Sequence, residues 1–422
     1  MAGPVDVIGI GADGPAGLKP GLVQRVRAAD FLAGGERHLS YFPDGPAERF
    51  VIKNNVGDLL AELGRRFRRQ RCVVLASGDP LFYGIGTKLL GSLGIANVRI
   101  EPAVSAMQLA FARASLSWEA AALASVHGRD LRTTLLPLLG RPLIGLFTHD
   151  GDSPAQVARF FLSRGAHDYE AMVAENLGAA AERVTPWLPL ERLADQRCAA
   201  LNYLILRRQA GADDPDLARR RALAPGIPDE EFLRPDAGPE VMTRQEVRAV
   251  LIARLGPGPA PGAPLWDIGA GLGTVAVEAA LLRPEREVLA VEKDPQRAEL
   301  LRRNCARFQT YNIRVIAGRA PEALAAEAER PGLVFVGGSG GRLAPLLDFI
   351  ADRLLDDGRL VANFVTLEHL ALTLDRLKAW GWPFGVTEVH VARGDVLAGL
   401  TGLKPQRGVF IVSADKRGPD HA

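Results

Sequence analysis

Cysteine is scarce in this sequence, and neither sign of charge is in large excess. Its 422 residues include three cysteines, Cys72, Cys198 and Cys305, which are odd in number, far apart and in apolar surroundings. We therefore expect reduced core side chains in a cytoplasmic protein rather than a disulfide framework. The formal net charge is only +2, so no overall field would recruit nucleic acid or a membrane surface.

Signals for membrane insertion, export and metal binding are missing as well. No uncharged apolar run is long enough to span a bilayer, and the first residues lack the basic region and apolar core of a signal peptide. The seven histidines are scattered, and no cysteine has metal-ligand spacing. Hydrophobic residues make up 47% and charged residues 24%, which is typical of a globular protein, and the length predicts two or three domains.

A glycine-rich stretch, Asp267-Ile268-Gly269-Ala270-Gly271-Leu272-Gly273-Thr274, stands between an apolar run and a helical pattern. It predicts a strand, a sharp turn and the first turn of a helix, with bare backbone open to a ligand. A dinucleotide site requires a glycine where Thr274 stands, and Asp267 would repel a pyrophosphate at close range. An acid here suits the cationic end of a ligand, and the segment resembles the corresponding turn of S-adenosylmethionine (SAM) methyltransferases. A tight turn without a ligand is the alternative.

This resemblance implies which residues bind SAM in the second half of the chain. Glu292 follows the next predicted strand, residues 287–291, where it can accept hydrogen bonds from both ribose hydroxyls. The other candidates lie in the glycine-rich turn, before a predicted helix at 245–255 and in a loop at 318–320. They are Thr243, Asp267, Gly269, Gly271, Gly273, Thr274, Arg319 and Ala320. The loops leave the carboxyl ends of predicted strands, where such sheets bind ligands.

Alternating strand and helix patterns predict an α/β layered domain in the first half. An apolar strand at 5–10 runs into a glycine-rich loop at 9–15, which lacks the Gly-Lys-Ser/Thr ending of a Walker phosphate cradle. The loop at 9–15 can be interpreted either as a structural turn or as a ligand-binding loop. The strand at 72–76 stops at Ser77-Gly78-Asp79-Pro80, and we expect a helix from Phe82, with Asp79 able to cap it.

Four motifs occur in order in this half: the loop at 9–15 and the stretches at 77–84, 104–107 and 125–129. Together they resemble the tetrapyrrole (corrin/porphyrin) methylase family over about residues 4–207. The resemblance implies two α/β lobes with SAM in the cleft between them, held by Gly78, Asp79, Ser105 and Ala106. It makes Arg129 a candidate for substrate binding and His127 a candidate for catalysis, with a core histidine as the alternative.

A polar stretch at 209–223, rich in Arg, Asp and Pro, predicts a linker between a domain at 1–208 and a second at 224–422. We interpret its arginines 219–221 as a solvated face rather than a nucleic-acid patch. Beyond the linker, strands and helices alternate to about residue 413. They predict a doubly wound, Rossmann-like sheet with an antiparallel edge.

Five small residues, Gly337, Gly338, Ser339, Gly340 and Gly341, follow the fourth strand of this predicted sheet. They leave room for a large flat substrate, and their amides can bind carboxylates; a merely flexible loop is the alternative. With the stretches at 363–368 and 403–406, residues 226–413 resemble a methylase of cobalamin synthesis. The large residue after Asn363 departs from that pattern.

Two fused modules in this order resemble the decarboxylating methyltransferases of that pathway. The resemblance implies one SAM site per module, a precorrin tetrapyrrole as substrate and self-association into a homo-oligomer. The first module would methylate C-5; the second would methylate C-15 and remove carbon dioxide from the ring-C acetate. Arginine and lysine suit carboxylates, so Arg129, Arg319, Arg342 and Lys404 are candidates for binding the substrate, and Arg342 also for catalysis.

No Ser-His-Asp or Cys-His set is evident, but the reduced tetrapyrrole can itself supply the nucleophilic carbon. One alternative is a SAM-dependent methyltransferase whose acceptor is an RNA or a protein histidine derivative. Another is a module that binds SAM without catalysing a reaction. The near-neutral charge and the loop at 337–341 disfavour RNA. Asp267 and Thr274 disfavour a dehydrogenase.

Overall fold

The computed structural model describes residues 3–209, 215–235, 242–260, 262–397 and 400–417. It divides into two compact units. The first comprises residues 1–131, 141–159 and 169–208, and the second comprises residues 132–140, 160–168 and 209–422.

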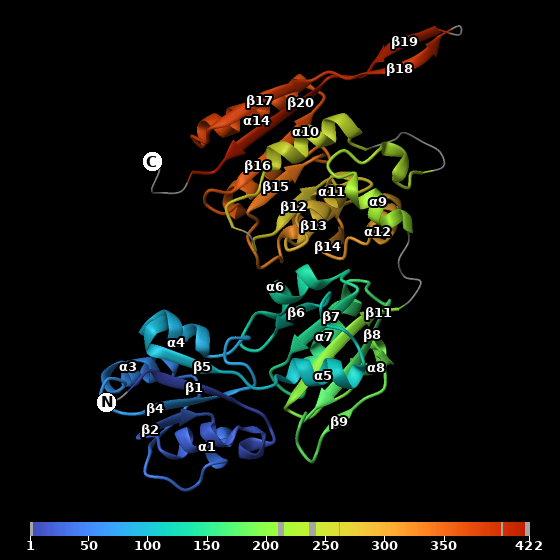
Figure 1. The fold of residues 1–422 in the computed structure, drawn as a ribbon. Coiled ribbons are helices and arrows are strands. Elements are labelled where there is room, and N and C mark those ends of the chain that lie inside the picture. Colours follow the sequence, from blue (N-terminus) through green and yellow to red (C-terminus); the bar gives the residue numbers. More distant parts are fainter. Residues whose placement is uncertain (1–2, 210–214, 236–241, 261, 398–399, 418–422) are drawn as a thin grey trace. The chain divides into compact units, whose positions relative to one another are not determined.

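Five parallel strands form the first sheet of the first unit, in the order β3-β2-β4-β1-β5 (Figure 1). The strands are β1 (Val5–Ile10), β2 (Phe31–Gly34), β3 (Glu48–Val51), β4 (Cys72–Ser77) and β5 (Val98–Glu101). Helices α3 (Val56–Arg66) and α4 (Gly86–Leu93) cover one face, while α1 (Pro20–Arg27) and α2 (Glu36–Ser40) cover the other. Both faces are apolar, as expected of a parallel sheet buried on two sides.

A second, mixed sheet completes the first unit, in the order β10-β8-β11-β7-β6 with β9 paired to β8. Its strands are β6 (Ala122–Ser125), β7 (Leu143–Phe147), β8 (Tyr169–Glu175), β9 (Arg183–Val184), β10 (Leu188–Pro189) and β11 (Asn202–Arg208). The accompanying helices are α5 (Ala106–Ala114) and α8 (Leu190–Leu193). Most of α6 (Leu131–Leu135) and the end of α7 (Ser153–Ser163) are assigned to the second unit. Helix α5 packs Met107 and Phe111 against Tyr203 and Ile205 of β11. Two α/β layers, one around each sheet, agree with the two lobes that the family resemblance implies.

Seven strands form the sheet of the second unit, in the order β14-β13-β12-β15-β16-β20-β17 (Figure 1). They are β12 (Leu265–Ile268), β13 (Val288–Glu292), β14 (Ile313–Ala317), β15 (Leu333–Val336), β16 (Arg359–Phe364), β17 (Phe384–Val389) and β20 (Val409–Asp415). The first five are parallel, and β20 runs antiparallel to both β16 and β17. The predicted doubly wound sheet with an antiparallel edge is confirmed.

Helices cover both faces of this sheet. Helices α10 (Gln245–Leu255), α11 (Thr274–Leu282) and α12 (Pro295–Phe308) share one apolar cluster with it. Helices α13 (Leu343–Arg353) and α14 (Leu367–Ala379) share another on the opposite face. The helix that connects β13 to β14 therefore lies on one face of the sheet, and the helix that connects β15 to β16 lies on the other. This change of face opens a crevice at the carboxyl ends of β12 and β15.

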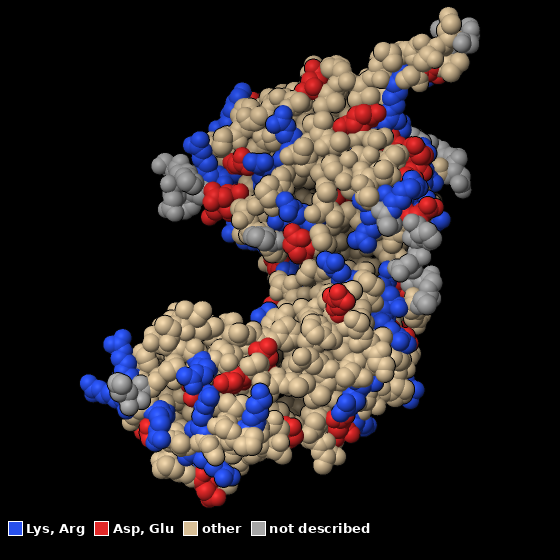
Figure 2. Space-filling view, viewed as in Figure 1, with Lys and Arg blue, Asp and Glu red and all other residues tan. Residues whose placement is uncertain are grey.

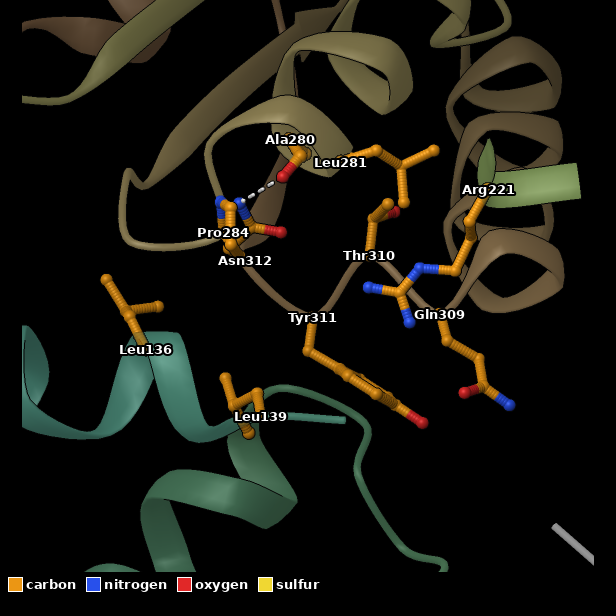
Figure 3. A pocket seen from close by; sticks show the side chains of 10 residues that line it. All are labelled: Leu136, Leu139, Arg221, Ala280, Leu281, Pro284, Gln309, Thr310, Tyr311 and Asn312. Carbon is orange, nitrogen blue, oxygen red and sulfur yellow. Dashed lines mark hydrogen bonds between the residues drawn. The ribbon is translucent and has the colours of Figure 1, made fainter. Parts of the chain in front are cut away.

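Asn312 fixes the start of β14. Its side-chain amide donates to the carbonyl oxygens of Ala280, Arg283 and Arg286, at 3.1, 3.1 and 2.9 Å. Figure 3 shows the bond to Ala280. The hollow drawn beside it in Figure 3 has a volume of about 10 Å³. One water molecule needs roughly 10–15 Å³, so this hollow is too small to hold a ligand.

The structure differs from the predicted elements in three places. The helix expected from Phe82 is wrong, because α4 begins only at Gly86. Residues 80–85 instead form a turn, in which a Cβ on Gly84 would lie 2.4 Å from the Pro80 carbonyl oxygen. An additional hairpin, β18 (Ala392–Leu397) and β19 (Leu400–Pro405), stands between the two final strands. Part of the predicted linker is helical, as α9 (Pro215–Ala222), while residues 210–214 lie outside the described residues.

Neither a membrane span nor a metal cluster is found in the part of the chain that the structure describes. No helix there is long and apolar enough to cross a bilayer. No three histidine, cysteine or acidic side chains among the described residues are grouped to hold a metal ion.

Candidate active site

A cavity of about 200 Å³ lies at the carboxyl ends of β12, β13 and β15 in the second unit. Its lining comes from the glycine-rich turn after β12, the end of β13, the loop after β14 and the glycine loop after β15. The lining residues are Ile268, Gly269, Gly271, Val291, Glu292, Lys293, Arg297, Gly318, Arg319, Ala320, Gly337, Gly338, Ser339, Gly340 and Leu346. Most of the predicted cofactor and substrate residues of this half therefore meet around one hollow.

Glu292 ends β13 with a side chain that is only 4% exposed. One carboxylate oxygen accepts from the backbone amide of Gly271 at 2.9 Å, and the other accepts from the amide of Asp294, also at 2.9 Å. Each oxygen has a further lone pair. The side chain thus holds the glycine-rich turn in place and can still accept hydrogen bonds from a diol in the cavity.

The two glycine loops approach each other closely. Gly269 has a φ of +73°, and a Cβ on it would lie 2.5 Å from the Gly338 carbonyl oxygen. The Gly337 amide donates to the Ile268 carbonyl at 2.9 Å. A Cβ on Gly338, by contrast, would have no heavy atom within 4 Å. The turn at Gly269 therefore requires glycine for both conformation and space, whereas Gly338 borders open space.

Three basic residues, Lys293, Arg297 and Arg319, line the same cavity as the buried Glu292. Asp294 caps α12 by accepting from the amides of Gln296 and Arg297, at 2.9 and 3.2 Å, which fixes where α12 starts beside the cavity. The Lys293 ammonium lies 3.4 Å from where a Cβ on Gly340 would be. The sequence pattern did not point to Lys293 or Arg297, whereas Gly318 belongs to the loop at 318–320 that the pattern did indicate. The only signal for Lys293 was its place directly after Glu292.

Asp267 lies beneath the cavity rather than in its wall. Its side chain is fully buried, and neither carboxylate oxygen has a hydrogen-bond partner in the described part of the chain. Burial raises its pKa to about 7; the nearby Ala276 amide lowers the pKa and the Glu292 carboxylate raises it further. Asp267 is therefore a buried residue of β12 that does not belong to the cavity lining.

Six other predicted residues do not line this cavity. Gly273 and Thr274 begin α11, where a Cβ on Gly273 would lie 2.7 Å from Leu301 Cγ. The Thr243 carbonyl accepts from the Arg248 guanidinium. Arg342 forms a 2.5 Å ion pair with Glu322, and Gly341 beside it is exposed. Lys404 lies on the hairpin β18–β19, 3.8 Å from Asp395, in a sheet separate from the one that carries the cavity.

In the first unit, three loops meet at the carboxyl ends of β1, β4 and β5. The Gly78 amide donates to the Ile10 carbonyl, and the Ala103 amide donates to the Gly78 carbonyl, both at 3.1 Å. Gly78 has a φ of +57°, and a Cβ on it would lie 2.9 Å from Ser105 Cα. Ser105 caps α5 together with Gln108. The predicted residues Gly78, Asp79, Ser105 and Ala106 are therefore neighbours in space.

The other two candidates of the first unit follow β6. His127 and Arg129 are both exposed, and the Arg129 guanidinium lies 5.0 Å from the ring centre of Tyr83. Tyr83 belongs to the loop that begins at Gly78, and its hydroxyl donates to the Leu123 carbonyl of β6 at 2.8 Å. The Gly78 loop and the end of β6 are therefore linked by direct contacts.

Comparison with known proteins now defines the class. Residues 5–193 match the family described as tetrapyrrole (corrin/porphyrin) methylases, and residues 237–416 match the precorrin methyltransferase domain. A precorrin-6Y C(5,15)-methyltransferase (decarboxylating) of a Sinorhizobium species is 34% identical over 94% of this chain and 93% of that protein.

Two shorter relatives each match less than half of the chain. A cobalt-precorrin-7 C(5)-methyltransferase of Salmonella typhimurium is 39% identical over 44% of this chain and 90% of its own length. A probable cobalt-precorrin-6B C(15)-methyltransferase (decarboxylating) of Pyrobaculum aerophilum is 37% identical over 45% of this chain and 95% of its own length.

The chain is thus a fusion of two methyltransferase modules of different folds. It belongs to the family of precorrin-6Y C(5,15)-methyltransferases (decarboxylating).

Proposed function

We propose that this chain methylates precorrin-6Y at C-5 and C-15 with SAM and removes carbon dioxide from the ring-C acetate, giving precorrin-8 in cobalamin biosynthesis. Full-length relatives carry this activity in their names. The single observation that carries the proposal is the cavity in the second unit, which is lined by a buried carboxylate, three basic residues and two glycine loops.

We propose one SAM site in each module, at residues 1–208 and 224–422, with 209–223 as the linker. In the second, the carboxylate of Glu292 would hold the ribose, and the bare backbone at Gly269 and Gly271 would lie against the rest of the molecule. The fit rests on the unused lone pairs of Glu292 and on the place of Gly269 and Gly271 in the cavity lining. In the first, Gly78, Asp79, Ser105 and Ala106 would form the site. SAM supplies an electrophilic methyl group at each.

The chain's own residues would bind and orient the macrocycle. Precorrins carry many carboxylates, and Lys293, Arg297 and Arg319 offer cationic partners beside the open space at Gly338. Holding the ring-C acetate there, away from bulk water, would favour loss of carbon dioxide. The electrons released can enter the conjugated ring, so the substrate serves as its own electron sink.

The chemistry is divided between the modules in this proposal. The first methylates C-5; the second methylates C-15 and decarboxylates. The existence of two shorter relatives, each named for one of the methylations, supports this division. Arg129 in the first module remains a proposed substrate contact. Gly341, Arg342 and Lys404 in the second are proposed contacts that a conformational change on binding would have to bring to the cavity.

We propose further that nucleic acid is not a partner and that the protein works in the cytoplasm as a homo-oligomer. On the face shown in Figure 2, basic and acidic side chains are interspersed, which does not favour nucleic acid. All three cysteines are free, which suits a reducing compartment. The exposed apolar side chains of Val396, Leu400 and Leu403 on the hairpin suit contact with a second copy.

One incubation tests the proposal. Purified protein is mixed with precorrin-6Y and SAM labelled with carbon-13 in the methyl group, and products are followed by mass spectrometry and NMR. We expect two labelled methyls and the loss of one carbon dioxide per macrocycle. Transfer of no methyl to the macrocycle, with SAM still bound, would refute the enzyme and favour a SAM-binding module.

A further inference from the structure

Two histidines of the first unit form a pair that the sequence pattern did not reveal. His127 follows β6 and His149 follows β7, and these strands are parallel neighbours. Their Nδ1 atoms are 3.1 Å apart, and their ring centres are 4.7 Å apart. Both side chains are exposed, so the pair is open to a ligand and to solvent.

The pair is anchored to the proposed SAM loop of its own unit. Phe82 and Tyr83 of that loop contact the ring of Phe147, with ring centres 5.4 and 5.9 Å apart. Phe147 ends β7, two residues before His149. Tyr83 also donates to β6 through its hydroxyl. The loop that begins at Gly78 therefore touches both strands whose ends carry the imidazoles.

The contact between two Nδ1 atoms determines what the pair can do. One imidazole must donate its Nδ1–H and the other must accept at Nδ1. The donor then has a bare Nε2, and the acceptor carries a hydrogen on Nε2. The neutral pair thus presents one proton acceptor and one proton donor. A proton taken up at one end can be matched by release at the other, without a lasting charge on either ring.

We propose that His127 and His149 form a proton relay for the methylation performed by the first module. This inference rests on the function proposed above. When an enamine carbon of the macrocycle takes the methyl group, its electron pair forms the new carbon–carbon bond. The carbon–sulfur bond breaks with its pair going to sulfur, and the enamine nitrogen becomes a cation. The N–H proton of that nitrogen passes to the bare Nε2 of the pair, the Nδ1 proton shifts across, and the outer Nε2 proton leaves to solvent.

Other titratable groups surround the pair without replacing it. Arg129 is stacked on Tyr83, which keeps a positive charge nearby. The Asp150 carboxylate accepts from the Ser153 hydroxyl and from the amides of Asp152 and Ser153, and His149 helps to lower the pKa of that carboxyl group. Burial, and then the neighbouring His149, lower the pKa of His127. The lowered pKa of His127 favours its neutral form at physiological pH, as a relay requires.

The test compares His149→Asn with His149→Ala in the full chain. Asparagine places a hydrogen-bonding group near the position of Nδ1 but cannot pass a proton on. We expect both variants to slow C-5 methylation by about 100-fold with little change in KM, and imidazole in the buffer to restore part of the rate of His149→Ala. His390→Asn is the matched control, because His390 is another exposed imidazole, 3.0 Å from Glu388 in the second unit. It should keep the wild-type rate.

A second measurement does not depend on turnover. Nitrogen-15 NMR of labelled histidines should show the pKa of His127 rising in His149→Ala, because the neighbouring ring is gone. A wild-type rate in His149→Asn would overturn the relay, since a hydrogen bond alone would then suffice. Loss of SAM binding in both variants would show a structural role. Failure of the wild-type chain to methylate C-5 at all would instead refute the proposed function.

Discussion

At the scale of single residues, Glu292 has two tasks that a ligand-binding assay can separate. Its carboxylate holds the Gly271 amide in the free chain and is proposed to bind the ribose diol. Hydrogen bonds to a charged group contribute about 1.5–3 kcal/mol each. Glu292→Ala should therefore weaken SAM binding at the second site by about 100-fold or more, and calorimetric titration of the full chain should report one tight site instead of two.

Glu292→Gln is the control for the hydrogen bond by which Glu292 holds the Gly271 amide. Glutamine keeps the size and one acceptor but loses the charge, so we expect an affinity between those of the wild type and Glu292→Ala. Two unchanged sites in Glu292→Ala would remove Glu292 from the cofactor site.

Asp267 predicts a pH dependence of stability. Its pKa is about 7 in the folded chain and about 3.9 in an unfolded chain. Between about pH 4 and pH 7 the folded state holds a proton that the unfolded state has lost, so stability falls as pH rises through this window. The full effect is on the order of 4 kcal/mol. Asp267→Asn cannot titrate, so wild type should lose stability relative to this variant between pH 5 and pH 8.

Hydrogen exchange at β12, measured at pH 5 and pH 8, provides the free energy of opening for both proteins. If the free energy of opening differs between wild type and Asp267→Asn by the same amount at pH 5 and pH 8, the carboxyl group stays ionised throughout this range.

At the scale of elements, the glycine loops offer a matched pair of substitutions. Gly269→Ala adds a methyl group 2.5 Å from the Gly338 carbonyl oxygen, at a φ of +73°, so the two loops must move apart. Gly338→Ala adds the same group where no atom lies within 4 Å. We expect Gly269→Ala to weaken SAM binding at the second site at least tenfold and Gly338→Ala to change it less than about twofold. Equal affinities in the two variants would contradict the close packing of these loops.

The elements that could be predicted from the sequence are those whose conformation is determined by a few residues close together in the chain. The turn at Asp267–Thr274 and the loop at Gly337–Gly341 were found because glycine spacing limits the backbone to few conformations. The helix predicted from Phe82 failed because Gly84 and Gly86 pack on the Pro80 carbonyl, a contact that a propensity pattern does not contain. The hairpin β18–β19 escaped notice because its strands are largely exposed and, among the described residues, form a two-stranded sheet of their own. The pair His127–His149 depends on strand neighbours, which the sequence order alone does not reveal.

At the scale of the whole molecule, the apolar cores predict two independent folding units. In the part of the chain that the structure describes, the clusters around β1, β4 and α5 draw on residues of the first half, and those around β12 draw on residues from Leu223 onward. Separate cores favour separate folding. Fragments 1–208 and 224–422 should each unfold cooperatively in isolation. Loss of exchange protection at 132–140 and 160–168 in the first fragment would argue against a boundary at residue 208.

The last prediction concerns the proposed division of the reactions, with C-5 methylation in the first module and C-15 methylation and decarboxylation in the second. Gly269→Asp places a bulky anion where the two loops of the second unit meet, so it should abolish C-15 methylation and decarboxylation while leaving the first SAM site able to bind. Gly78→Asp should do the converse at the first site, where a Cβ would lie 2.9 Å from Ser105 Cα, and should abolish C-5 methylation. Carbon-13 methyl signals assigned by NMR would locate the methyl groups, and mass spectrometry would show whether the acetate carboxyl is kept. Because each variant damages only one of the two proposed SAM sites, neither should add both methyls. A Gly269→Asp protein that still methylates C-15, or a 1–208 fragment that decarboxylates alone, would show that the two activities are not divided between the modules in this way.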